Sequence, residues 1–159
     1  MSNVKEVDVW TGNVQEAWVD YNGHMNDAAY AKVFSLSLDA LMAHIGLDAT
    51  GIAKLEYTIF TLEAHIKYVS EVHQGQTLHV AMKLLDVDPK RMHLWFVMKD
   101  DQGNTVATSE QMVMGMDQSI GRPAPFPAEV QTEISKLPLL EKDEWPEVAN
   151  QPMGIRRKR

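Results

Sequence analysis

The 159-residue sequence contains no cysteine, which excludes disulfide bonds, a cysteine nucleophile and thiolate metal sites. Basic residues are also scarce: 15 Lys and Arg against 22 Asp and Glu give a formal net charge of −7. An acidic chain is poorly suited to nucleic acid or to an anionic membrane surface, so we expect neither partner. The net negative charge favours a cationic ligand, although salt screens the long-range attraction.

Long hydrophobic runs are missing as well. No apolar stretch approaches the length of a membrane span, and the first eight residues lack the apolar core of a signal peptide. We therefore expect a cytoplasmic protein. At this length we expect one domain over residues 1–159, with a core over about 7–117 and a C-terminal extension over 118–159.

Helical spacing is clearest after residue 27, where apolar side chains recur on one stripe as far as Gly46, a typical C-terminal cap. The stripe comprises Tyr30, Phe34, Leu38, Leu41 and Ile45. No comparable helix follows before the C-terminal segment. A helix this apolar is expected to be wrapped by a sheet.

Alternation of apolar and polar residues predicts the strands. They cover residues 7–18, with a bulge at Gly12, and then 55–68, 78–84, 92–98 and 105–117. On the second strand, the alternation assigns one buried face to Phe60, Leu62, Ala64, Ile66 and Tyr68. Residues 47–53 are expected to be a connector, 121–127 an extended exit and 128–140 a short covering helix. One long helix followed by four antiparallel strands indicates an α+β fold.

The segment WVDYNGHMNDAAY, residues 18–30, places polar side chains at every second position immediately before the long helix. Asn26 is a typical N-cap, and Asp27 falls in the first turn, where the helix dipole favours an anion. A capped helix behind a solvated loop would explain these two residues. It does not explain why Asp20, Asn22 and His24 occur together, and this cluster indicates a functional loop aimed at a helix N-terminus.

The order Asp20, Asn22, His24, Asn26 and Tyr30 resembles the D-x-N-x-H-x-N-N-x-x-Y segment of hot-dog-fold thioesterases, in the 4-hydroxybenzoyl-CoA thioesterase-like superfamily. Asp27 stands where many relatives carry a second Asn. The resemblance runs from about Val7 to Asp117 and includes LEAHIKYVSEVHQGQTL. The segments NGHMN, TSEQMVMGMD and GIRRK are similar, more narrowly, to the betainyl-CoA thioesterases of carnitine breakdown.

This resemblance implies the hot-dog fold, an antiparallel β-sheet wrapped around one long central α-helix. It also implies an acyl-CoA substrate with a short polar acyl group, and no cofactor beyond the coenzyme A of the substrate. In this family the sites lie at subunit interfaces, and a sheet with an open edge gains a second wall from a partner. We therefore expect a homodimer or a dimer of dimers.

Thioester hydrolysis needs a nucleophile, or a base for water, together with donors for the oxyanion. We assign the first role to Asp20, which would either form a mixed anhydride or deprotonate water; the sequence does not choose between the two routes. The backbone N–H groups of His24, Met25 and Asn26 are the expected oxyanion donors. Asn22 and the His24 side chain are expected to orient Asp20, the water or the carbonyl.

Several further residues are candidates for substrate contacts. Glu63 and His65 either belong to a polar outer face of the sheet or reach the site across a dimer interface. Glu110 lies on an otherwise apolar face, and with an aromatic ring such as Trp95, Trp18 or Tyr30 it would suit a trimethylammonium group. The alternative for Glu110 is an edge carboxylate paired with Lys or Arg.

Arginine forks suit the phosphates of coenzyme A, and the candidates are Arg91, Arg122, Arg156 and Arg157. The last two lie in the tail from Glu141 onward, for which the alternative of a frayed, solvated terminus is favoured. The six histidines show no metal-ligand spacing, so no metal site is expected. Two other functions remain open: a hot-dog hydratase or dehydratase with His24 or His65 as base, and a CoA-ester-binding module without catalysis.

Overall fold

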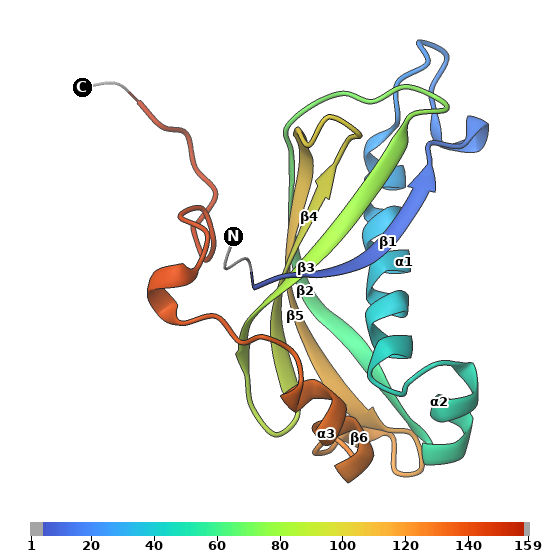
Figure 1. The fold of residues 1–159 in the computed structure, drawn as a ribbon, viewed down its shortest axis with the longest axis vertical. Coiled ribbons are helices and arrows are strands. Elements are labelled where there is room, and N and C mark those ends of the chain that lie inside the picture. The colour runs from blue at the N-terminus through green and yellow to red at the C-terminus, as the bar shows by residue number, and fades with distance from the viewer. Residues whose placement is uncertain (1–4, 158–159) are drawn as a thin grey trace.

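One long helix, α1 (Asp27–His44), lies against one face of a curled antiparallel sheet in the computed structural model, which describes residues 5–157 (Figure 1). The strand order is β1-β3-β4-β5-β2, with the short β6 paired to β5. The main strands are β1 (Val7–Asn13), β2 (Tyr57–Tyr68), β3 (Thr77–Val87), β4 (Arg91–Lys99) and β5 (Thr105–Asp117). Strands β1 and β2 therefore form the two edges of the sheet.

The long helix forms as predicted. The Asn26 side chain accepts a hydrogen bond of 3.0 Å from the Ala29 N–H and so caps the first turn. The chain leaves the helix at Gly46, whose φ of 92° is readily reached only by glycine. The predicted stripe on this helix is fully buried in the main core, from Tyr30 to Ile45.

Two segments before β2 differ from the prediction. The first strand stops at Asn13, because Glu16–Trp18 turns into a short 3-10 helix, and its irregularity lies between Asp8 and Trp10 and not at Gly12. Most of the expected connector over 47–53 belongs to a second helix, α2 (Ala49–Leu55), which also takes the first residue of the strand predicted over 55–68. Its start is fixed by Asp48, whose side chain accepts a 2.8 Å hydrogen bond from the Gly51 N–H.

Strand β2 contains a bulge that the alternation rule cannot detect. Its register against β5 shifts between Thr61 and Glu63, so that Leu62 is an extra residue. Phe60 pairs with Met114, whereas Ala64 pairs with Gln111, and these two partners lie on opposite faces of β5. The prediction that Phe60 and Ala64 share one face is therefore wrong.

The C-terminal extension packs onto the sheet. Helix α3 (Ala128–Ser135) is shorter than predicted and buries Val130 and Ile134 in the main core. Farther on, the indole N–H of Trp145 donates to the Leu85 carbonyl at 3.1 Å, and Ala149 is buried beside Trp95. The expectation of a frayed terminus is thus wrong as far as residue 150. Apolar contacts hold the segment on the face of the sheet that is turned away from α1, which we call the outer face.

The final described residues are different. Residues 151–157 are exposed and belong to no helix or strand, and this stretch includes Arg156 and Arg157. Within the described chain, 5–157, no helix has the length and apolar character needed to cross a membrane.

Candidate functional site

The loop before α1 is closed by its own carboxylate. Asp20 Oδ1 accepts hydrogen bonds from the backbone N–H groups of Asn22 at 2.9 Å and His24 at 3.2 Å. The backbone of Asp20 adds two bonds, to the His24 carbonyl and from the N–H of Gly23, whose φ is 81°. The loop is therefore rigid, and the side chains of Asp20 and Asn22 remain exposed at its tip.

The three backbone donors that we assigned to the oxyanion are all engaged within the chain. The His24 N–H serves Asp20, the Met25 N–H donates to the Val72 carbonyl at 2.9 Å, and the Asn26 N–H donates to the Trp18 carbonyl at 2.9 Å. The structure contradicts that assignment, because an oxyanion would have to displace one of these bonds. Among the described residues, the backbone N–H of Asp27 at the start of α1 has no such partner.

The imidazole of His24 contacts two residues that no sequence pattern singles out. Its Nε2 lies 3.5 Å from Oε2 of Glu71, and its ring meets that of His73 edge-on with centroids 4.7 Å apart. Both partners come from the segment between β2 and β3, which pairs with the loop through an isolated bridge between His24 and His73. In sequence that segment reads only as a turn.

A pocket of about 260 Å³ opens at the start of α1. Its lining includes Met25, Asp27, Tyr30, Tyr68 and Glu71. The Tyr30 hydroxyl donates to the Ser70 carbonyl at 3.0 Å, and the Tyr30 ring meets Tyr68 edge-on with centroids 5.2 Å apart. Burial raises the pKa of Tyr30, and the negative charge of Glu71 acts in the same direction.

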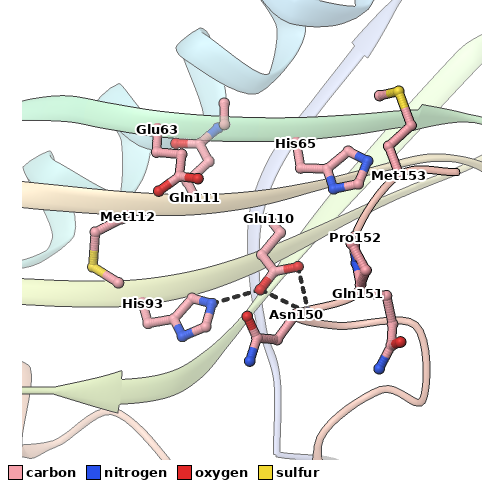
Figure 2. Close-up of a pocket in the computed structure, with 11 residues that line it drawn as sticks. Glu63, His65, His93, Glu110, Gln111, Met112, Asn150, Gln151, Pro152 and Met153 are labelled. Carbon is pink, nitrogen blue, oxygen red and sulfur yellow. Dashed lines mark hydrogen bonds and ion pairs between the residues drawn. The ribbon is translucent and has the colours of Figure 1, made fainter.

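A larger pocket of about 660 Å³ lies on the outer face, between the sheet and the C-terminal segment (Figure 2). At its centre, Glu110 Oε2 lies 2.7 Å from His93 Nε2, and both side chains are largely buried. The backbone N–H of Asn150 donates to the same carboxylate at 2.8 and 3.0 Å. Glu110 is thus held by an imidazole and a backbone N–H, where the sequence suggested Lys or Arg.

These two pockets lie on opposite faces of the sheet. Glu110 stands directly opposite His65 on β2 and Trp95 on β4, and directly opposite residues share a face. Tyr30, by contrast, projects from α1 on the other face. Within one chain the structure therefore does not bring Glu63, His65, Trp95 or Glu110 to the loop that carries Asp20.

The arginine candidates are also remote from this loop within the chain. Arg91, the first residue of β4, is paired with Asp88 of the preceding turn, with Nε 2.7 Å from Oδ2. Arg122 lies in β6 (Arg122–Pro123), at the same end of the sheet and opposite the end reached by the loop before α1 (Figure 1). Arg156 and Arg157 lie in the exposed C-terminal stretch.

The curled sheet, the buried helix and the capped loop define a hot-dog protein, and residues 14–134 match the family model of the thioesterase-like superfamily. The chain belongs to this superfamily, which confirms the predicted fold and the predicted class of enzyme, a thioester hydrolase.

We compare the chain with three similar proteins. The chain is 42% identical over 121 residues to a betainyl-CoA thioesterase of Pseudomonas aeruginosa, covering 76% of each chain. It is 37% identical to an L-carnitine dehydrogenase/betainyl-CoA thioesterase of Rhizobium meliloti, covering 78% of this chain and 25% of that protein. A Staphylococcus aureus structure in complex with CoA superposes with a TM-score of 0.86 at 31% identity, covering 98% of this chain and 100% of that one.

Proposed function

We propose that this protein hydrolyses a short, polar acyl-CoA ester, with betainyl-CoA as the preferred substrate, to the free acid and CoA. The observation that carries the proposal is the geometry of Asp20: an exposed carboxylate, anchored by its own loop, beside the start of a buried helix. The similarity to the Pseudomonas aeruginosa enzyme supports the acyl group. The fused Rhizobium meliloti relative supports a place in carnitine breakdown, and we retain a cytoplasmic location.

In this mechanism the two oxygens of Asp20 have different roles. Oδ1 accepts both loop hydrogen bonds and is fixed in place. Oδ2 is then the oxygen that attacks the thioester carbonyl carbon or takes a proton from water. Either route transfers the acyl group to oxygen and releases the thiolate of CoA, which is protonated to the thiol.

The developing oxyanion needs a donor that the chain has not already used. The Asp27 N–H meets this requirement. The positive end of the α1 dipole would stabilise the oxyanion further. His24 is a positioning residue in this scheme, because its backbone N–H holds Asp20 while its ring contacts Glu71.

We infer that two copies complete the site through β2. This edge strand and the residue after it expose apolar side chains, among them Phe60, Leu62, Tyr68 and Val69, all more than half exposed. A two-fold axis across this edge would pair the strands antiparallel and bring the far end of one sheet toward the loop of the other. Arg91 and Arg122 stand at that end, where they would meet CoA phosphates.

Release of free thiol from a panel of acyl-CoA esters tests this function against the alternatives. Thiol release, fastest with betainyl-CoA, supports the proposal. Addition of water to an enoyl-CoA without thiol release would indicate a hydratase, and binding of CoA esters without turnover would indicate a binding module. Either of these results would overturn the proposed function.

A further inference from the structure

We propose that the pocket at the start of α1 is the subsite for the cationic head of the acyl group, with Tyr30 and Tyr68 as aromatic walls and Asp27 and Glu71 as counter-charges. This inference rests on the proposed function. It replaces the cation site that the sequence suggested around Glu110 and Trp95, which lies on the other face of the sheet.

The chemistry of the substrate restricts where such a subsite lies. In a betainyl thioester a single methylene separates the quaternary nitrogen from the carbonyl carbon. The cation must therefore lie immediately beside the carbon that Asp20 attacks or exposes to water. A pocket on the outer face cannot meet this condition within the same chain, whereas a pocket that begins at Met25, within the loop region, can.

Direct contacts connect Asp20 to this pocket. The backbone N–H of His24 donates to Asp20, and the ring of the same residue lies 3.5 Å from Glu71, which lines the pocket. Met25, the next residue, lines the pocket too and is anchored by its bond to Val72. The attacking carboxylate and the pocket are thus held by one rigid segment.

The walls fit a quaternary ammonium group, which has no N–H to donate and is recognised through aromatic rings and negative charge. Tyr30 and Tyr68 meet at 87°, so the two rings form a corner. Hydrogen bonds fix both rings: Tyr30 donates to the Ser70 carbonyl at 3.0 Å and Tyr68 to the Asp27 carbonyl at 3.5 Å. Tyr68 is 52% exposed within the single chain, so part of its ring is accessible at the β2 edge that we place between two copies.

The charges of the pocket also favour a cation. Among the ion pairs of residues 5–157, neither Asp27 nor Glu71 is paired with Lys or Arg; the nearest basic group to Glu71 is His24. The raised pKa of Tyr30, to which Glu71 contributes, is consistent with this negative potential. A bound cation would offset two carboxylates that the chain itself leaves without a strong partner.

A neutral isostere isolates the effect of the charge. In 3,3-dimethylbutanoyl-CoA a quaternary carbon replaces the quaternary nitrogen, with the same shape and no charge. The measured quantity is the ratio of kcat/KM for betainyl-CoA to kcat/KM for this isostere, followed by thiol release. We expect a ratio of about ten or more for the unmodified protein.

Four variants test the assignment. Tyr68→Leu and Glu71→Gln should each lower the ratio about fivefold to tenfold, whereas Tyr68→Phe, which keeps the ring, should hold it within about twofold. Glu129→Gln, at an exposed position on α3, is the matched charge control and should leave the ratio unchanged. Circular dichroism of each variant verifies folding.

The outcomes separate this inference from the function on which it rests. A ratio near one in the unmodified protein, or an equal loss for both substrates in Tyr68→Leu and Glu71→Gln, overturns the cation subsite and leaves a thioesterase. Absence of thiol release from every CoA ester overturns the proposed function and the subsite together. Selective loss with betainyl-CoA supports both.

Discussion

The carboxylate of Asp20 accepts a hydrogen bond of 3.2 Å from the backbone N–H of His24, so the residue that we assign to catalysis also shapes its own loop. These two roles can be separated. Asp20→Asn keeps an oxygen that can accept the loop bonds but removes the nucleophile or base. We expect the rate of thiol release to fall by about 10²–10⁴-fold, with the melting temperature within about 2 °C of the unmodified protein.

Asp20→Ala is the matched structural variant. It removes the acceptor for the N–H groups of both Asn22 and His24. We therefore expect its free energy of unfolding to be about 1 kcal/mol lower than that of Asp20→Asn. Thermal unfolding and thiol release on the same samples check both effects. An Asp20→Asn protein with nearly unchanged activity would remove this carboxylate from the mechanism.

The parts of the fold that follow from local patterns could be predicted from the sequence. The stripe from Tyr30 to Ile45 predicts a buried helix, because apolar residues at this spacing leave one face in need of a cover. The N-cap role of Asn26 is equally local, since it depends on the Ala29 N–H three residues away. Both predictions are confirmed.

Features that depend on pairing between distant segments could not be predicted. A single extra residue at Leu62 moves Phe60 to the outer face, and alternation along one strand gives no sign of it. The N–H of Met25 is taken by Val72, which the sequence places 47 residues away. The same holds for Tyr68 and Glu71, which reach the pocket only because β2 ends beside α1.

The pair formed by Glu110 and His93 predicts that the Glu110 carboxylate holds the C-terminal segment on the outer face of the sheet. Glu110→Ala leaves the imidazole and the Asn150 N–H without their shared acceptor, and we expect the free energy of unfolding to fall by about 3 kcal/mol. The C-terminal segment should then detach more easily, so trypsin should cut faster after the exposed Lys142.

Glu63→Ala is the control for this experiment, because it removes an exposed carboxylate from the rim of the same pocket. We expect it to change neither the unfolding free energy by more than about 0.5 kcal/mol nor the rate of cleavage. Equal cleavage in Glu110→Ala and Glu63→Ala would show that the carboxylate does not hold the segment in place.

The exposed edge of β2 predicts association between copies of the chain. A lysine introduced at Leu62, which is 54% exposed, should place like charges close together across a two-fold interface and prevent pairing. Light scattering should give at least the mass of a dimer for the unmodified protein and that of a monomer for Leu62→Lys, with reduced thiol release. Ile120→Lys, in the turn before β6, is a control with a similarly exposed side chain and should remain associated. A monomeric unmodified protein would contradict the shared site.

Tyr57 predicts how stability depends on alkaline pH. Its hydroxyl is buried and donates to the Ala124 carbonyl at 2.7 Å, and burial, followed by the negative charge of Asp117, strongly raises its pKa. Above about pH 10 the unfolded chain releases a proton that the folded protein retains, so the free energy of unfolding falls as pH rises. Tyr57→Phe should lower the free energy of unfolding by about 1 kcal/mol near pH 7, because the hydrogen bond is lost. Above about pH 10 the free energies of unfolding of the variant and the unmodified protein should become more similar, because phenylalanine has no proton to lose. Denaturant unfolding near pH 7 and above about pH 10 measures this difference, and Tyr21→Phe is the control at an exposed tyrosine. A difference in unfolding free energy that is the same at the two pH values would show that Tyr57 ionises alike in the folded and unfolded protein.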